Sequence, residues 1–149
     1  MASKKKRSNN KKKIKSDPLF NLLFKAALPY LQRAHSPYSH VQVASSVLMN
    51  DGMIYSGCNI ENASYGGTIC AERVAITKAV SEGSKKIRAI LVVTNQKSIW
   101  PPCGFCRQVI AEFASASAVV YMCDKKMNFK KLSFKKLFPS HFDSHFLAK

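Results

Sequence analysis

The sequence predicts an α/β fold, a three-layer αβα sandwich around a mixed sheet of about five strands. The first supporting observation is the order of the patterns along the chain, which runs helix, hairpin, helix, strand, helix, strand. The second is that residues 88–94 and 118–123 are apolar runs of strand length separated by a helical pattern. Buried strands separated by a helix are typical of a parallel pair covered by helices on both faces. The fifth strand is a short segment to which the pattern gives no position.

The first predicted helix begins at Asp17, because Asp is a good N-cap and Pro18 suits the first helical position. Apolar residues then recur with helical spacing as far as Leu31. Pro29 lies inside this run, and a proline lacks the amide hydrogen that a helix interior needs. We therefore expect the helix to kink or end near Leu28.

A β-hairpin is predicted next. Residues 41–49 have the pattern of a strand, Asn50-Asp51-Gly52 is a strong hairpin signal, and residues 53–59 form the returning strand. Residues 60–69 are polar and contain two glycines, so we expect a loop there.

Helices and strands then alternate to the end of the chain. A helix is predicted from Cys70 to the neighbourhood of Gly83, since glycine commonly follows the last turn of a helix. The remaining predicted elements are a buried strand at 88–94, a helix at 105–114, a buried strand at 118–123 and a short helix at 132–138.

The net charge of +16 is unevenly spread along the chain. Residues 1–15 contain eight basic side chains and no acidic one, which is half of the net charge. Such a block repels itself and stays solvated, so we expect a disordered basic tail over 1–16 and one domain over 17–149. Nuclear targeting and RNA binding are the specific interpretations of this tail. A merely solvated tail is favoured over both, because no aromatic platform for single strands accompanies the charge.

The sequence contains no signal for export or membrane insertion. Its apolar stretches are interrupted before the roughly 18 residues that a membrane span needs, and no apolar segment follows the N-terminal charges. The five cysteines are an odd number, which argues against a disulfide framework. We therefore expect a cytoplasmic protein whose cysteines are buried or bind a metal.

Three of these cysteines have the spacing of a catalytic zinc site. Cys103 and Cys106 form a C-x-x-C pair at the start of one predicted helix, and Cys70 stands at the start of another. Helix N-termini favour the thiolate, and three protein ligands leave the fourth zinc position open for water. Glu72 follows Cys70 by two residues and can carry protons. Cys-x-Glu with a later Pro-Cys-x-x-Cys is typical of zinc deaminases.

A closed structural zinc site is the alternative interpretation of this pattern. It needs a fourth ligand, for which Cys58 and Cys123 are the candidates. Closed sites usually contain a recognisable second pair of ligands, and the chain offers none, so the open site is favoured. Cys58 and Cys123 are expected to be packed apolar groups in strands.

The motifs also give the chain a family resemblance. Residues 36–142 resemble the small, homotetrameric class of cytidine deaminases. The stretches that carry the resemblance are Pro37-Tyr38-Ser39, Gly57 to Tyr65 (GCNIENASY), Ile69 to Arg73 (ICAER), and Pro102-Cys103-Gly104 with Cys106-Arg107-Gln108. The resemblance implies a cytidine deaminase-like fold and zinc as cofactor. It also implies hydrolytic deamination of cytidine and 2'-deoxycytidine in pyrimidine salvage, by zinc-activated water with Glu72 as the proton shuttle.

Further residue roles follow from the resemblance. Asn59 and Glu61 would hold the ribose hydroxyls, and Arg73 would offset the negative charge of three thiolates on one zinc. Phe142 would cover the base from a neighbouring subunit. The complete set of implied substrate contacts is Asn59, Glu61, Tyr65, Ala71 and Phe142.

Four positions depart from the family pattern. Val41 stands where the family usually has phenylalanine, Ala44 replaces a glycine, Gly67 replaces a leucine, and Phe105 replaces a small residue. These changes concern substrate affinity and leave the zinc set intact. Two alternative functions stay open: a polynucleotide cytosine deaminase recruited by the lysines, and a non-catalytic zinc-binding module whose tail binds nucleic acid.

Overall fold

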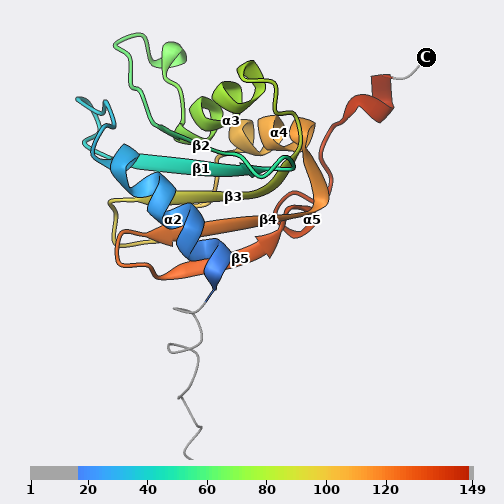
Figure 1. Cartoon of the computed structure of the whole chain (residues 1–149). Helices are drawn as coiled ribbons and strands as arrows, with labels where there is room; N and C mark the ends of the chain where they lie inside the picture. Colours follow the sequence, from blue (N-terminus) through green and yellow to red (C-terminus); the bar gives the residue numbers. More distant parts are fainter. Residues whose placement is uncertain (1–16, 148–149) are drawn as a thin grey trace, which may run out of the picture.

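The computed structural model describes residues 17–147 and confirms the predicted α/β sandwich (Figure 1). Five strands form one mixed sheet in the order β2-β1-β3-β4-β5. The strands are β1 (Val43–Met49), β2 (Ile54–Cys58), β3 (Ile87–Thr94), β4 (Ala114–Asp124) and β5 (Phe129–Ser133). As predicted, β3 and β4 are parallel, and the other neighbouring pairs are antiparallel. The expected basic tail lies outside the described residues.

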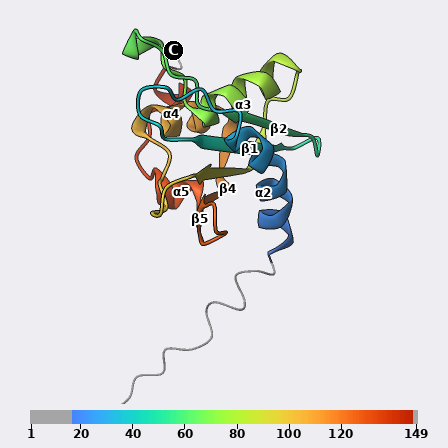
Figure 2. The same ribbon diagram turned by 90° about the vertical axis from the view of Figure 1, so that its left-hand side faces the viewer.

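Helices cover both faces of the sheet, as Figures 1 and 2 show. One face packs against α2 (Pro18–Leu31), and the other packs against α3 (Ala71–Ser81), α4 (Gly104–Phe113) and α5 (Phe134–Leu137). Two short 3-10 turns, η1 (Tyr65–Gly67) and η2 (Ser144–Leu147), complete the elements. No helix within residues 17–147 is long and apolar enough to cross a membrane.

Each face of the sheet has its own apolar core, and β3 contributes to both. Leu91 and Val93 pack in the cluster with α2, whereas Ile90 packs in the cluster with α3 and α4. A strand that is buried on both faces carries apolar residues at successive positions. This explains the continuous apolar run from which the strand was predicted.

The N-terminal helix continues through the proline that was expected to end it. Asp17 caps α2, its Oδ1 accepting a hydrogen bond from the Phe20 amide at 3.1 Å. The helix then extends past Pro29 to Leu31, so the predicted end near Leu28 is wrong. Leu31 is buried in the core, and its burial offsets the one hydrogen bond that a proline cannot donate.

The C-terminal third contains the fifth strand, whose position could not be predicted from the pattern. The helix predicted over 132–138 is replaced by the end of β5 and the four-residue α5. A tight turn joins β4 to β5, in which Asp124 Oδ1 accepts hydrogen bonds from the amides of Lys126 at 2.8 Å and Asn128 at 3.0 Å. β5 is an edge strand with two exposed lysines, and its sequence lacks the alternation that marks a strand.

Two glycines let the hairpin and its neighbouring helix adopt their positions. Gly52, in the β1–β2 turn, has a φ of +87°, which side chains with a Cβ rarely adopt. Gly57, on β2, lies directly under α3. A Cβ at this position would be 2.7 Å from Val74 Cγ1 and 2.8 Å from the Ala75 amide nitrogen. The missing side chain therefore allows α3 to pack closely on the sheet.

Candidate active site and metal centre

Three sulfur atoms meet where α3 and α4 begin. Cys70 is the N-cap of α3, Cys103 is the N-cap of α4, and Cys106 lies in the first turn of α4. The Sγ atoms of Cys70 and Cys103 are 4.0 Å apart, and all three Sγ atoms lie within 4.8 Å of one another. Tetrahedral zinc with Zn–S bonds of about 2.3 Å needs sulfurs about 3.8 Å apart. The three thiols therefore fit a zinc ion.

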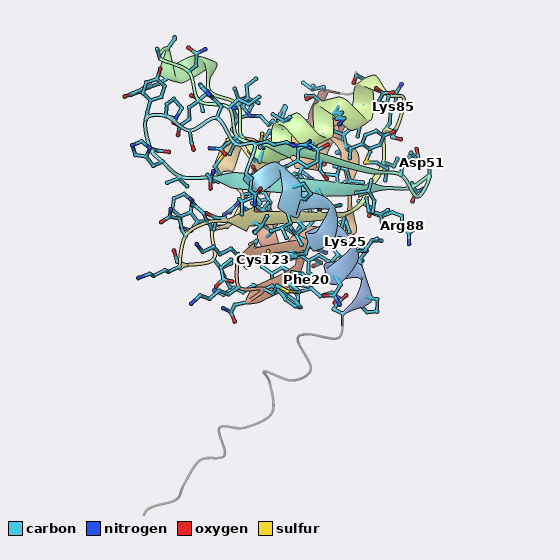
Figure 3. The ribbon with its side chains drawn as sticks, turned by 60° about the vertical axis from the view of Figure 1, so that its left-hand side comes forward. Phe20, Lys25, Asp51, Lys85, Arg88 and Cys123 are labelled. Carbon is cyan, nitrogen blue, oxygen red and sulfur yellow. The ribbon has the colours of Figure 1, made fainter. Side chains whose placement is uncertain are left out.

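The described residues offer no fourth side-chain ligand to this cluster. Cys58 lies elsewhere, its sulfur 3.4 Å from the Arg33 carbonyl oxygen. Cys123 is buried in the core with α2, and Figure 3 shows it near Phe20 on that side of the sheet. The alternative interpretation, a closed structural site, thus lacks its last ligand among residues 17–147, whereas an open site needs only the three thiols.

The surroundings of the sulfurs favour charge on Cys70. The hydrogen bond from the Cys106 thiol lowers the pKa of Cys70, and Arg73 lowers it further despite partial burial. The pKa of Cys106 is raised in turn by its interaction with Cys70 and by burial. Thiolates are the form that binds metals, so the cluster is prepared for a cation.

Arg73 is held beside the cluster by two contacts. Its Nη2 donates a hydrogen bond to the Thr68 carbonyl at 2.7 Å, and its Cζ lies 4.4 Å from the centroid of the Phe105 ring. Its Nε is buried and has no hydrogen-bond partner among the described residues. The contact with Phe105 has no signal in the sequence, because these two residues lie in the first turns of different helices.

Glu72 is the buried carboxyl group of the site. It lies in the first turn of α3, two residues after Cys70, and its side chain is 4% exposed. Burial raises the pKa of Glu72 to about 7, and the neighbouring Cys70 contributes to the rise. A carboxyl group with a pKa near neutrality can both accept and release a proton at physiological pH.

A cavity of about 310 Å³ opens over these groups. It is lined by Ser39, Val41, Val43, Asn59, Glu61, Thr68, Cys70, Ala71, Glu72, Val92, Trp100, Pro101 and Cys103. The cavity therefore brings together two of the three predicted zinc ligands, the predicted proton carrier and three of the five predicted substrate contacts. Cys106 is buried and Arg73 is not among the lining residues.

Asn59 and Glu61 line the cavity with polar groups that are already oriented. Asn59 accepts a hydrogen bond from the Val43 amide at 2.9 Å and donates one to the Val41 carbonyl at 2.8 Å. Glu61 accepts hydrogen bonds from the amides of Tyr38 at 2.9 Å and Ser39 at 3.2 Å, and a further one from the Ser39 hydroxyl. The hydrogen bond from Ser39 is the largest cause of the lowered pKa of Glu61. Asn59 keeps one N–H for a ligand, and the ionised Glu61 keeps free lone pairs.

Two predicted substrate contacts, Tyr65 and Phe142, lie outside this cavity. Tyr65 is 78% exposed and lines a neighbouring hollow with Tyr38. Phe142 is 55% exposed and stacks on Phe146, while Gln108 Nε2 donates a hydrogen bond to its carbonyl oxygen at 2.7 Å. Neither side chain is brought to the pocket of its own chain.

The four departures from the family pattern occupy different places. Val41 lines the cavity, and Phe105 contacts Arg73. Ala44 is buried in the core with α2, and Gly67 is exposed in η1. Val41 is thus the departure that borders the space for a ligand.

Several lining residues were not predicted as site residues. Ser39 belongs to a stretch that carries the family resemblance, so a signal for it existed. Val92 carried none, because it reaches the cavity through the folding of a distant strand, and Thr68 lies two residues before Cys70 outside any motif. Trp100 also lines the cavity.

Comparison with known proteins supports the chemistry of this site. The family model described as "Cytidine and deoxycytidylate deaminase zinc-binding region" matches residues 20–123. The chain belongs to the cytidine and deoxycytidylate deaminase family. This deaminase is therefore a member of a family of zinc-dependent hydrolases, with zinc as its cofactor, and its three-cysteine cluster can hold the metal.

Relatives of this deaminase match most of its length. A cytidine deaminase of Halalkalibacterium halodurans is 45% identical over 121 residues, which are 81% of this chain and 92% of that protein. A probable cytidine deaminase of Dictyostelium discoideum is 46% identical over 112 residues, 74% of this chain and 75% of that protein. The crystal structure of cytidine deaminase from Burkholderia pseudomallei is 35% identical, with a TM-score of 0.78 over 82% of this chain and 98% of that one.

Proposed function

We propose that this deaminase converts cytidine and 2'-deoxycytidine to uridine and 2'-deoxyuridine, with release of ammonia. The observation that carries the proposal is the placement of buried Glu72 beside the three-thiol cluster in a cavity that also contains Asn59 and Glu61. The part of the cavity with Glu72 and the thiols suits hydrolysis, and the part with Asn59 and Glu61 suits a sugar. Relatives named cytidine deaminase, up to 46% identical among those compared, support the same assignment.

Cys70, Cys103 and Cys106 would hold the zinc. Zinc in such a site supplies Lewis-acid chemistry that makes hydroxide available near neutral pH. Arg73 lies next to the cluster and would offset part of the negative charge of three thiolates.

Glu72 would move the protons of the reaction. Its carboxylate takes a proton from the attacking water and delivers it to N3 of the pyrimidine ring, while the oxygen adds to C4. It then carries the proton of the new C4 hydroxyl to the amino group, and ammonia leaves as the C4–N4 bond breaks and the C4 carbonyl forms. A pKa raised to about 7 by burial suits a group that must accept and donate in one cycle.

The other wall of the cavity would bind the nucleoside. The remaining N–H of Asn59 and the free lone pairs of Glu61 match the hydroxyls of a ribose, which both donate and accept. Ala71 opens α3, where main-chain N–H groups lack helical partners, so its backbone can meet the polar edge of the base.

We further propose a homotetramer in which neighbouring subunits complete each site. Several aromatic side chains are exposed on this chain, among them Tyr38, Tyr65, Phe105 and Phe142, and are available for contacts with neighbouring subunits. Phe142 would then cover the base bound by a neighbouring chain. A role in pyrimidine salvage in the cytoplasm agrees with this substrate.

The function is tested with the substitution Glu72→Gln, which keeps the shape of the side chain and removes its carboxylate. Turnover of cytidine, followed by the absorbance change of the base, should fall by about 100-fold or more. Zinc content, measured by elemental analysis, should stay at the wild-type value. Wild-type turnover in this variant would rule out the assignment of Glu72.

The same assay distinguishes a nucleoside from a polynucleotide substrate. Purified, zinc-loaded wild-type protein is given cytidine in one reaction and a cytosine-containing oligonucleotide in another. We expect turnover of cytidine. Turnover of the oligonucleotide alone would overturn the proposed substrate.

A further inference from the structure

A second, larger hollow lies at the other end of the sheet. Its volume is about 590 Å³, and three basic side chains line it, namely Lys85, Lys86 and Arg88. These residues stand at the beginning of β3, whereas Val92 of the active-site cavity is near the end of the same strand. Figure 3 shows Lys85 and Arg88 near the β1–β2 turn that contains Asp51.

This hollow adjoins another one lined by lysines. Ser117 lines both of them, and the second hollow, of about 200 Å³, also includes Lys131 and Lys136. Lys131 Nζ lies 2.9 Å from Asp17 Oδ2, at the residue that caps the start of α2.

We call Lys85, Lys86, Arg88, Lys131 and Lys136 the basic track. Within residues 17–147 the ion pairs are Lys131–Asp17 and His141–Asp143, so four members of the track have no acidic partner. Glu112 is the one acidic residue that lines either hollow. The fold thus leaves most of the basic side chains of the track without an ion pair.

We propose that the basic track binds nucleic acid through its phosphates. Cations spread along two adjoining hollows, four of them without an ion pair, match a chain of phosphates, and the serine hydroxyls that line the hollows add neutral donors. None of the exposed large apolar side chains of the described residues lines either hollow. Stacking on bases therefore contributes little, and binding is independent of base sequence.

The same lack of exposed apolar side chains argues against a membrane as the partner. Surface helices that bind bilayers insert apolar side chains between the lipids, and the basic track offers none. The track also lies away from the cavity that contains Glu72, so bound nucleic acid leaves the cavity open. This second function does not depend on the proposed deamination of nucleosides.

The test compares two double variants of the full chain that lose the same charge. Lys85→Gln with Lys86→Gln alters the track, and Lys78→Gln with Lys97→Gln is the control, since neither Lys78 nor Lys97 lines either hollow. Fluorescence anisotropy with a labelled 20-nucleotide RNA of mixed sequence measures affinity over a range of salt concentrations. The track variant should bind about fivefold or more weakly at 0.1 M salt, with a salt slope reduced by about 1.4 for two lost phosphate contacts. The control should change affinity less than twofold.

Three results would overturn the proposal. Equal losses in the two variants would mean that only net charge matters, and undetectable RNA binding by the wild-type chain would remove the function altogether. Binding to vesicles of phosphatidylcholine and phosphatidylserine in the absence of RNA binding would replace nucleic acid with a membrane. Cytidine turnover, measured on the same preparations, should be unchanged in both variants. A lack of turnover in all of them would contradict the nucleoside deaminase and leave the RNA result standing.

Discussion

The contact between Arg73 and Phe105 joins the first turns of the two helices that carry the sulfurs. A guanidinium over an aromatic ring at a partly exposed site is worth about 0.5–1 kcal/mol. Phe105→Leu should therefore release zinc to a chelating dye about two- to fivefold faster than the wild type. The Arg73 side chain would lose one of the two neighbours that keep it near Cys70.

Phe105→Tyr is the matched control for this prediction, because it keeps the ring and its size. Its rate of zinc release should equal that of the wild type. Equal rates in the Leu and Tyr variants would mean that the ring does not position Arg73.

At the scale of single residues, the sequence predicts which side chains could carry the chemistry better than it predicts which residues surround them. Cys103, Cys106 and the Cys70–Glu72 pair were found because ligands on one helical turn must lie close together in the chain. The orientation of Asn59 by the backbone of Val41 and Val43 follows from strand pairing, which short motifs do not encode. Val92, which strand pairing brings to the cavity, was missed for the same reason.

The close packing of α3 on β2 depends on Gly57. A methyl group in the Gly57→Ala variant would overlap Val74 Cγ1 and the Ala75 backbone, which cannot both move aside without displacing α3. We expect the free energy of unfolding to fall by about 1–3 kcal/mol, measured by urea denaturation. Turnover should fall as well, because α3 carries Cys70 and Glu72 at its start. Gly66→Ala, at a position with open space, is the control that should leave stability nearly unchanged.

The start of α2 is expected to be sensitive to acid. Partial burial raises the pKa of Asp17, but hydrogen bonds from Lys131, the Phe20 amide and Tyr121 outweigh it, so the pKa lies below 3.8. The carboxylate therefore contributes its full stability above about pH 4, and loses it as the pH falls through its lowered pKa.

Asp17→Ala tests this contribution and should lower the free energy of unfolding by about 1 kcal/mol at pH 7 through loss of the cap. The difference from the wild type should shrink as the pH falls toward 2. A difference that stays constant between pH 7 and pH 2 would show that the ionised carboxylate is not the stabilising form.

Elements with one dominant signal were predicted well, and elements with conflicting signals were not. The prediction gave Pro29 more weight than the apolar spacing that continues to Leu31. In the structure, the burial of Leu31 stabilises the last turn by more than the missing hydrogen bond of Pro29 destabilises it. β5 forms because β4 offers it a partner with five paired positions, although its own sequence contains adjacent lysines. Tertiary pairing of this kind is not visible in a local pattern.

Across the whole molecule, the two proposed functions occupy opposite ends of β3. The nucleoside cavity lies near Val92, and the basic track begins at Lys85. The sheet, with an apolar core on each face, lies between them, so each end can be changed by mutation without removing the other. The layered fold itself was predictable from the sequence, because alternating buried strands and helices permit few arrangements.

Removal of zinc should lower the stability of the whole fold. A metal that binds the native chain and not the unfolded one adds a free energy that grows with the metal concentration. Dialysis against a chelator should therefore lower the temperature of unfolding measured by calorimetry, and added zinc should restore it. Cys103→Ser should show a smaller response to the chelator, and an equal response would mean that the three sulfurs are not the ligands.

The meeting of two helix starts at three sulfurs also has a consequence for how the chain folds. A metal bound there closes a loop that contains α3 and β3 and so links segments that are distant in the sequence. The free energy of coordination offsets the entropy lost when that loop closes, so the ion cross-links the fold in addition to its role in the reaction. The melting temperature of the protein then depends on the concentration of free zinc in its surroundings and can be used to report it.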